Sequence, residues 1–195
     1  MIMKMTILTV MLMILLVSSN MSAMEFQLYV PLGVSAKSDI MFKQLYGERN
    51  TFYGAGAAIF FNKNWGAYVD THIMNTDGES NYYKQDISYS ETSVGIGMVY
   101  RFNIWDPSPN TRLNIFVKLG AQFINFSEEF TEKISDSVFG FSAGCGVMFW
   151  FEQFGLGLEL KREMAEKDVS IQGTGTSESI SFNSTKVSVN GAIRF

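Results

Sequence analysis

Cysteine, histidine, proline and charge are all scarce in this 195-residue chain, which has one Cys, one His, three Pro and 17% charged residues. A single Cys excludes an intramolecular disulfide, and one Cys with one His excludes a zinc site built from these ligands. The net charge of −4 lacks the basic surplus of nucleic-acid-binding proteins, so no nucleic-acid partner is expected. Beyond the N-terminus, no apolar run is long enough to cross a bilayer as a helix.

Apolar and aromatic side chains are abundant instead, at 47% and 14% of the residues. The length of the chain favours a single domain. Together these values leave two classes of protein: a soluble all-β protein with an aromatic core, or a β-barrel embedded in a membrane.

The N-terminal segment has the composition of a secretory signal peptide. One lysine precedes the apolar stretch Thr6–Val17, which is short for a transmembrane helix, and small residues follow it. The sequence therefore predicts a signal peptide over residues 1–23 and one barrel domain over residues 24–195. Cleavage is expected between Ser19 and Ala23, and an uncleaved N-terminal anchor is the alternative.

Apolar and polar residues alternate with a period of two throughout the rest of the chain, which is the pattern of β-strands with two different faces. In the last segment, Val187, Val189, Ile193 and Phe195 share one face, and mainly polar residues share the other. No segment shows a competing helical period. The alternation predicts eight strands, at Phe26–Val34, Tyr53–Phe61, Ala67–Ile73, Val94–Phe102, Leu113–Phe123, Phe139–Phe151, Phe154–Lys161 and Val187–Phe195.

The predicted connections alternate between short and long, as they do in outer-membrane barrels. A soluble β-sandwich has no reason to sort its loops in this way. The short turns lie at 62–65, 104–111 and 152–153, and the long polar loops at 36–50, 75–86, 127–137 and 163–181.

The residue types on the two strand faces favour the membrane barrel. Glycine is frequent on the polar face, where it would weaken a strand facing water but makes room for long charged side chains inside a narrow barrel. The apolar face therefore points to lipid. Aromatic residues near the strand ends predict two interfacial girdles, with Trp65, Tyr100, Trp105, Phe149 and Trp150 near the short turns and Tyr53, Tyr89, Phe123, Phe126 and Phe139 near the long loops.

These features predict an all-β, eight-stranded, antiparallel, up-and-down transmembrane barrel. With the terminal pattern Val187-x-Val189-x-Gly191-x-Ile193-x-Phe195, the chain resembles small outer-membrane barrels of the OmpA/OmpX type, the outer membrane protein beta-barrel domain family. The resemblance implies the outer membrane of a double-membraned bacterium. It also implies that Ile193 and Phe195 form an assembly signal for the barrel-assembly machinery, the second expected partner besides outer-membrane lipids. We expect a monomer.

The inward-facing positions carry a balanced set of charges, which predicts a closed ionic plug. A selective pore would carry a surplus of one sign, and the interior of an eight-stranded barrel is narrow enough for side chains to fill. Glu25 and Arg194 are expected to be neighbours at the short-turn end. The other predicted members are Asp70, Lys118, Glu159 and Lys161 near mid-height, with Glu91, Arg101, Glu163 and Lys186.

Three further features bear on activity. His72 faces the bore, but the residue two positions beyond it is Met74, so no His-x-Ser arrangement exists; Cys145 is on the lipid-facing parity, where a thiolate is disfavoured. We therefore expect no catalysis, no metal and no cofactor. The last loop favours simple hydrophilic cover. The alternative is that strands seven and eight continue beyond the membrane as a ribbon whose exposed edge suits strand addition, because Val169, Ile171 and Ile180 alternate with polar residues there.

The leading functional hypothesis is a non-enzymatic integral outer-membrane protein. Its expected role lies in envelope structure and surface-loop interactions, including adhesion to a host or extracellular ligand. A narrow channel for small solutes or ions is the alternative, and a lipid-modifying enzyme is the weaker third hypothesis.

Overall fold

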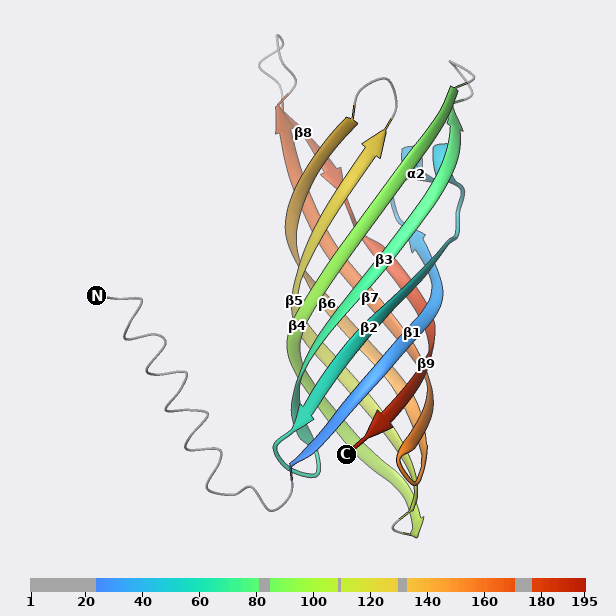
Figure 1. The fold of residues 1–195 in the computed structure, drawn as a ribbon. Coiled ribbons are helices and arrows are strands. Elements are labelled where there is room, and N and C mark those ends of the chain that lie inside the picture. Colours follow the sequence, from blue (N-terminus) through green and yellow to red (C-terminus); the bar gives the residue numbers. More distant parts are fainter. Residues whose placement is uncertain (1–23, 81–84, 109, 130–132, 171–176) are drawn as a thin grey trace, which may run out of the picture.

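The computed structural model describes residues 24–80, 85–108, 110–129, 133–170 and 177–195, which form a closed barrel of tilted strands (Figure 1). Each strand pairs antiparallel with its neighbours in chain order. The elements are β1 (Glu25–Lys37), α2 (Ile40–Tyr46), β2 (Asn50–Phe60), β3 (Trp65–Ser80), β4 (Gln85–Ser108), β5 (Thr111–Glu129), β6 (Lys133–Phe151), β7 (Phe154–Ser170), β8 (Ser177–Ser181) and β9 (Ser184–Arg194).

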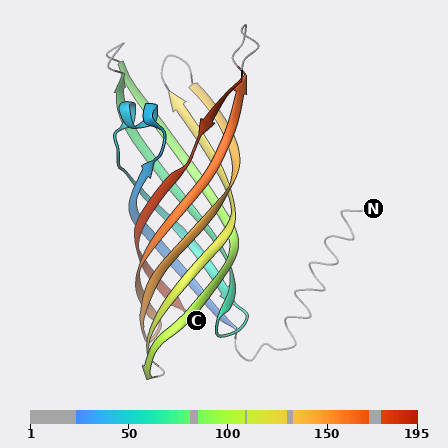
Figure 2. The same cartoon turned by 180° about the vertical axis from the view of Figure 1, so that it is seen from behind.

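The barrel closes where β9 pairs with both β7 and β1, for example at Leu28↔Ile193 and Leu158↔Val189. Among the described residues, β8 pairs only with β7, and it precedes β9 directly, so the two segments form one barrel strand interrupted at residues 182–183. The reverse view shows this last strand running alongside β7 (Figure 2). The predicted eight-stranded, antiparallel, up-and-down barrel is confirmed. The predicted signal peptide lies outside the described residues.

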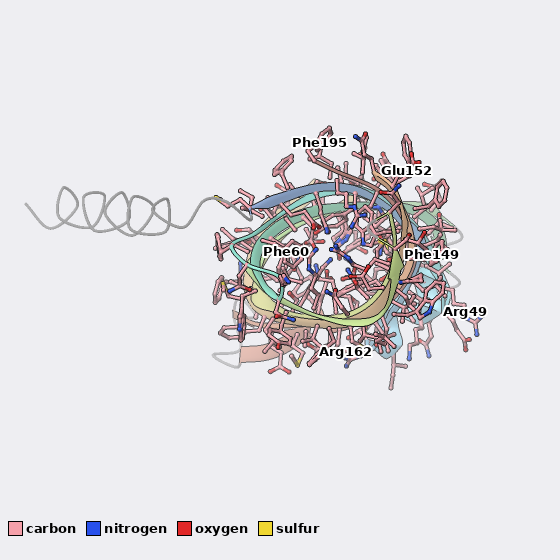
Figure 3. The ribbon with its side chains drawn as sticks, turned by 90° about the horizontal axis from the view of Figure 1, so that it is seen from below. Arg49, Phe60, Phe149, Glu152, Arg162 and Phe195 are labelled. Atoms are coloured by element: carbon pink, nitrogen blue, oxygen red, sulfur yellow. The ribbon has the colours of Figure 1, made fainter. Side chains whose placement is uncertain are left out.

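Apolar side chains lie on the outer surface and polar ones fill the bore. On β5, Leu119 is 65% exposed, whereas Gln122 is fully buried and Lys118 is nearly so. In the view along the axis, nitrogen and oxygen atoms occupy the centre of the ring, and the labelled Phe195 lies outside it (Figure 3). This inversion of a soluble core is the arrangement required when the outside faces lipid. Among the described residues, no helix combines the length and apolar character needed to cross a membrane.

Three of the predicted long loops are largely strand, so their prediction as loops is wrong. The ribbon considered for strands seven and eight is present, because β7 and β8 pair as far as Ser170↔Ser177. β3 and β4 pair as far as Ser80↔Gln85, and β5 and β6 pair as far as Glu129↔Lys133. Above the lipid belt, the outer faces of these strands carry polar residues in place of apolar ones, so the sequence there resembles a polar loop. The fourth long loop, 36–50, contains α2, and the predicted turn 104–111 is mostly the irregular end of β4.

The predicted aromatic girdles are present but smaller than expected. Trp65, Trp105 and Phe149 are exposed near the short turns, and Tyr53, Phe123 and Phe139 near the opposite end. Trp150 and Tyr89 are buried inside the barrel, and Phe126 packs against interior clusters, so assigning these three to the girdles is wrong. Each stands one position away from the outward parity of its strand.

The interior is layered along the barrel axis. An apolar cluster at the short-turn end contains Tyr29, Phe60, Tyr68, Phe116 and Trp150. Two more lie at the other end, one formed by Tyr46, Phe52, Met74, Ile87 and Tyr89 and the other by Ile124, Val138, Ala165 and Phe182. Buried charges occupy the levels between them.

Candidate functional site

Two direct ion pairs occupy the middle of the bore. Lys118 Nζ on β5 lies 2.9 Å from Glu159 Oε2 on β7, and Lys161 Nζ on β7 lies 2.9 Å from Asp70 Oδ1 on β3. All four residues are buried. Since β3 and β7 are on opposite sides of the ring, the Lys161–Asp70 pair spans the lumen instead of following the wall.

A second layer of charges lies above the first, toward α2. Lys186 Nζ lies 2.8 Å from Glu163 Oε2 and donates to Ser93 Oγ across the lumen at 3.1 Å. Glu91 accepts hydrogen bonds from Lys37 and from the Tyr89 hydroxyl. Each of these carboxylates therefore has a basic partner, as burial of a charge requires.

A third group of charges lies at the short-turn end. Arg101 reaches from β4 to Glu25 on β1 with two hydrogen bonds, of 2.5 and 3.1 Å, and its guanidinium lies 3.8 Å from the centre of the Phe60 ring. Arg112 adds a contact of 3.4 Å to Glu25.

The expected grouping of Glu25 with Arg194 is not observed. Although β1 and β9 are neighbours, Arg194 donates to the Glu152 carbonyl oxygen at 2.8 Å and lies over the Trp150 ring. The described side chains form no ion pair between Arg194 and Glu25. Glu25 instead forms an ion pair with Arg101 on β4.

Three residues of the charged interior, Lys37, Arg112 and His72, are absent from the charge network that the sequence predicts. Lys37 and Arg112 both have the inward parity, but Lys37 lies in the predicted loop 36–50, and Arg112 lies between the predicted turn 104–111 and the strand that begins at Leu113. His72 was placed in the bore, and its Nδ1 lies 3.7 Å from Glu163 Oε1. Extending the period-two pattern by three residues beyond Val34 would have identified Lys37.

Little free space remains in the lower bore. A cavity of about 30 Å³ lies between the short-turn aromatic cluster and the mid-level ion pairs, lined by Tyr29, Phe116, Trp150, Lys118 and Glu159 among others. A cavity of this size holds little more than one water molecule. Lys118 Nζ lies 4.4 Å from the Tyr29 ring centre, so aromatic and charged layers are in direct contact.

A pocket with a volume of about 340 Å³ lies at the mouth of the barrel, and segments predicted as loops form most of its walls. Its walls are mainly aromatic. Phe42, Tyr46 and Tyr89 pack against one another, with ring centres 4.8–5.5 Å apart. Phe126 packs against Phe182 at 4.6 Å. The polar lining comes from Lys37, Asp39, Glu128 and Ser181.

The helix α2 forms one side of this pocket and is held by specific contacts. The Asp39 carboxylate caps its N-terminus by accepting from the Phe42 N–H at 2.8 Å, and Gly47 ends it with a φ of 86°. The Tyr46 hydroxyl donates to Glu128 Oε1 at 2.5 Å. Burial and this hydrogen bond raise the pKa of Tyr46 well above its usual value, so the phenol remains a neutral donor.

The two residues considered for catalysis are far from any shared site. His72 is enclosed in the bore, where its ring packs edge-on against Phe52, and Cys145 is exposed on the outer face of β6. Within the described ranges, no group of three potential ligands is arranged to hold a metal ion. Neither His72 nor Cys145 lines the pocket at the mouth.

Comparison with known proteins gives a consistent result. The sequence profile described as outer membrane protein beta-barrel domain matches residues 8–192. No curated protein matches the chain. Neisserial surface protein A has a similar structure, with a TM-score of 0.60 at 12% identity over 89% of this chain and 98% of that one.

Two further solved structures are similar. OprG from Pseudomonas aeruginosa has a TM-score of 0.59 at 10% identity, covering 89% of this chain and 96% of its own. Ail, the attachment invasion locus protein of Yersinia pestis, solved with the heparin analogue sucrose octasulfate, has a TM-score of 0.50 at 15% identity, covering 89% and 99%. At such identities the likeness concerns the fold alone.

Proposed function

Because the chain belongs to the outer membrane protein beta-barrel domain family, we propose that it is a closed, non-enzymatic barrel whose working surface is its extracellular end. Its role there is in envelope structure and in binding an extracellular or host ligand, adhesion included. In this proposal, residues 1–23 direct secretory export, the barrel-assembly machinery inserts the chain, and the barrel acts as a monomer in contact with outer-membrane lipids.

The observation that carries the proposal is the cross-lumen ion pair between Lys161 and Asp70. A narrow pore needs a continuous row of water, whereas this pair, with Lys186 reaching Ser93 in the layer above, places protein atoms across the middle of the bore. Separating the pair would leave two unpaired buried charges, which is costly. The bore therefore supports a structural plug better than a path for solutes.

The extracellular end has the features that a binding surface needs. The strands β3 to β6 continue beyond the apolar belt with polar outer faces, and the mouth holds the pocket beside α2. The Ail structure contains a sulfated polyanion. The pocket of this chain presents the carboxylates of Asp39 and Glu128, so a polyanion is a poor match for it.

Conductance of the purified, folded protein in a planar lipid bilayer tests the closed bore. We expect no discrete current steps, with an open porin in the same bilayer as the control for insertion and detection. Stable, ion-selective steps from the wild-type protein would contradict the plug and favour the narrow channel.

A cell-binding assay tests the surface role. Bacteria displaying the wild-type barrel are compared, on immobilised host matrix, with bacteria displaying a variant whose β3–β4 and β5–β6 hairpins are shortened to the levels of Asn75 and Asn125. We expect the shortened variant to remain folded and to lose attachment. Equal attachment of both strains, or none above a strain without the barrel, would contradict adhesion.

A further inference from the structure

The pocket at the barrel mouth has a chemical character of its own. Its aromatic rings come from four separate parts of the chain: Phe42 and Tyr46 from α2, Tyr89 from β4, Phe126 from β5, and Phe182 from the break before β9. Tyr46, Tyr89 and Phe182 are each buried to more than nine-tenths. The pocket volume of about 340 Å³ is within the range of small-molecule sites.

The pocket lining contains two acidic residues, Asp39 and Glu128, and one basic residue, Lys37. Lys37 is already neutralised by Glu91 beneath the pocket, whereas Asp39 and Glu128 form no ion pair with the described side chains. Glu128 is positioned by the Tyr46 hydroxyl on one of its oxygens. The lining therefore carries two carboxylates that form no ion pair with the described side chains and one ammonium that does, and its walls include five aromatic rings, whose faces carry the negative part of the ring quadrupole.

From this combination we propose that the pocket binds a small organic cation, an ammonium group carried on an apolar body. Aromatic faces attract such cations through the ring quadrupole, and an ammonium group loses less on leaving water when a carboxylate is beside it. Glu128 is the counter-charge, and the rings of Phe126 and Phe182 contact the apolar part. This proposal rests on the proposed function only in treating the extracellular end as the working surface.

Specific contacts fix the position of α2 against the barrel, so the pocket is a permanent part of the fold. At Gly78 on β3, a Cβ would lie 2.2 Å from the Leu45 carbonyl oxygen, so the helix backbone packs directly on the strand. Together with the Asp39 cap and the Tyr46–Glu128 hydrogen bond, this contact fixes the wall to which Phe42 and Tyr46 belong. The wall thus exists before any ligand arrives, which lowers the entropy lost on binding.

Titration calorimetry on the full chain in zwitterionic nanodiscs tests the proposal. Benzyltrimethylammonium is the probe, with benzyl alcohol as the neutral comparison and benzenesulfonate as the anionic one. We expect saturable, one-site binding of the cation, and binding of the other two at least about fivefold weaker. Equal or tighter binding of the alcohol or the sulfonate, or no binding of the cation, would overturn the proposal.

Two variants and a matched control locate the site. Glu128→Gln keeps the shape and an acceptor for Tyr46 but removes the charge, so cation affinity should fall about fivefold while benzyl alcohol is unaffected. Phe182→Leu should weaken the cation about threefold with the barrel still folded. Glu129→Gln, an exposed neighbour on the same strand, should change nothing.

The control also separates a pocket from a general surface effect. If Glu129→Gln weakens the cation as much as Glu128→Gln does, the attraction is the field of the whole extracellular surface and the assigned site is wrong. The outcome is independent of the bilayer recording, because a conducting barrel can still bind the cation and a closed one can fail to.

Discussion

Tyr29 on β1 lies directly across the strand pairing from Gly56 on β2, and its ring fills the space where a side chain at residue 56 would begin. A Cβ at this glycine would stand 2.3 Å from the Tyr29 ring. The same relation recurs at the short-turn end, where Trp150 pairs with Gly155 on the next strand. Glycines on the inner wall therefore make room for the aromatic rings that close the lower bore.

Gly56→Ala should destabilise the barrel by about 1–3 kcal/mol, because the ring of Tyr29 has to move from a tightly packed position. Gly191→Ala is the matched control: its Cβ would meet nothing within 4 Å, so its effect should stay within about 0.5 kcal/mol. Equilibrium unfolding in denaturant with phospholipid vesicles measures both values. Equal stabilities of the two variants would show that Tyr29 does not depend on this space.

The period-two pattern was sufficient to predict the strands and which face of each points to lipid, because that parity depends only on local alternation. The ion pairs depend on the stagger between strands, which no local pattern contains. Glu25 thus contacts Arg101 three strands away instead of Arg194 on the adjoining strand. Lys118 and Glu159 form an ion pair because the stagger of their strands places both residues at the same level along the barrel axis.

The pocket beside α2 could not be predicted for a different reason. Its helix is seven residues long, too short for a periodic signal, and lies in a segment interpreted as a loop. Its remaining walls belong to strand extensions above the lipid belt, where polar residues on the outer face concealed the inward aromatic ones such as Tyr89 and Phe126. The available indication was an apolar residue at every second position among polar neighbours, at Ile87 and Tyr89 on β4 and at Ile124 and Phe126 on β5.

Glu159→Ala should cost about 3–5 kcal/mol of stability, since it leaves the buried ammonium of Lys118 without its carboxylate. The Asn190 amide loses its acceptor as well. Glu129→Ala removes an exposed carboxylate and should stay within about 0.5 kcal/mol. The same unfolding assay applies, and a loss below 1 kcal/mol for Glu159→Ala would argue that water, and not Glu159, solvates Lys118.

Migration on a cold SDS gel should depend on heating. A closed ladder of main-chain hydrogen bonds has no edge from which detergent can unravel it, so the unboiled protein should run as a compact species and the boiled protein more slowly. Refolded protein and protein kept in urea serve as the two reference states. Identical migration before and after boiling would contradict a closed barrel that resists SDS.

Phe195 should matter more for assembly than for stability. Its main chain exchanges two hydrogen bonds with Phe26, and its ring is exposed on the outer surface. Phe195→Ala keeps the backbone bonds and should cost no more than about 3 kcal/mol, yet sharply reduce the amount of folded protein in the outer membrane. Phe154→Ala, which removes a similarly exposed ring at the same end, is the control. Equal yields from both variants would remove the special role of the terminal residue.

The upper parts of β6 and β7 are held together by a pair that should respond to acid. The described register between these strands ends at Gly140↔Ala165, and above it Lys167 bridges to Asp136 and donates to the Ser137 carbonyl oxygen at 3.2 Å. The hydrogen bond from Lys167 and one from the Ser137 N–H lower the pKa of Asp136 below its ordinary 3.8. At pH values above 3.8, the bridge therefore holds the upper parts of β6 and β7 together. It is lost as the pH falls through the lowered pKa of Asp136.

Spin labels at Ser135 and Glu166, exposed positions on the two strands, measure the separation directly. At pH 7 we expect one narrow distance distribution, and near pH 3 or below a broader and longer one, because a protonated Asp136 no longer holds Lys167. Asp136→Asn should show the broad distribution at both pH values. A distribution that stays narrow in acid, or that broadens equally in Asp136→Asn on acidification, would assign the response to a group other than this bridge.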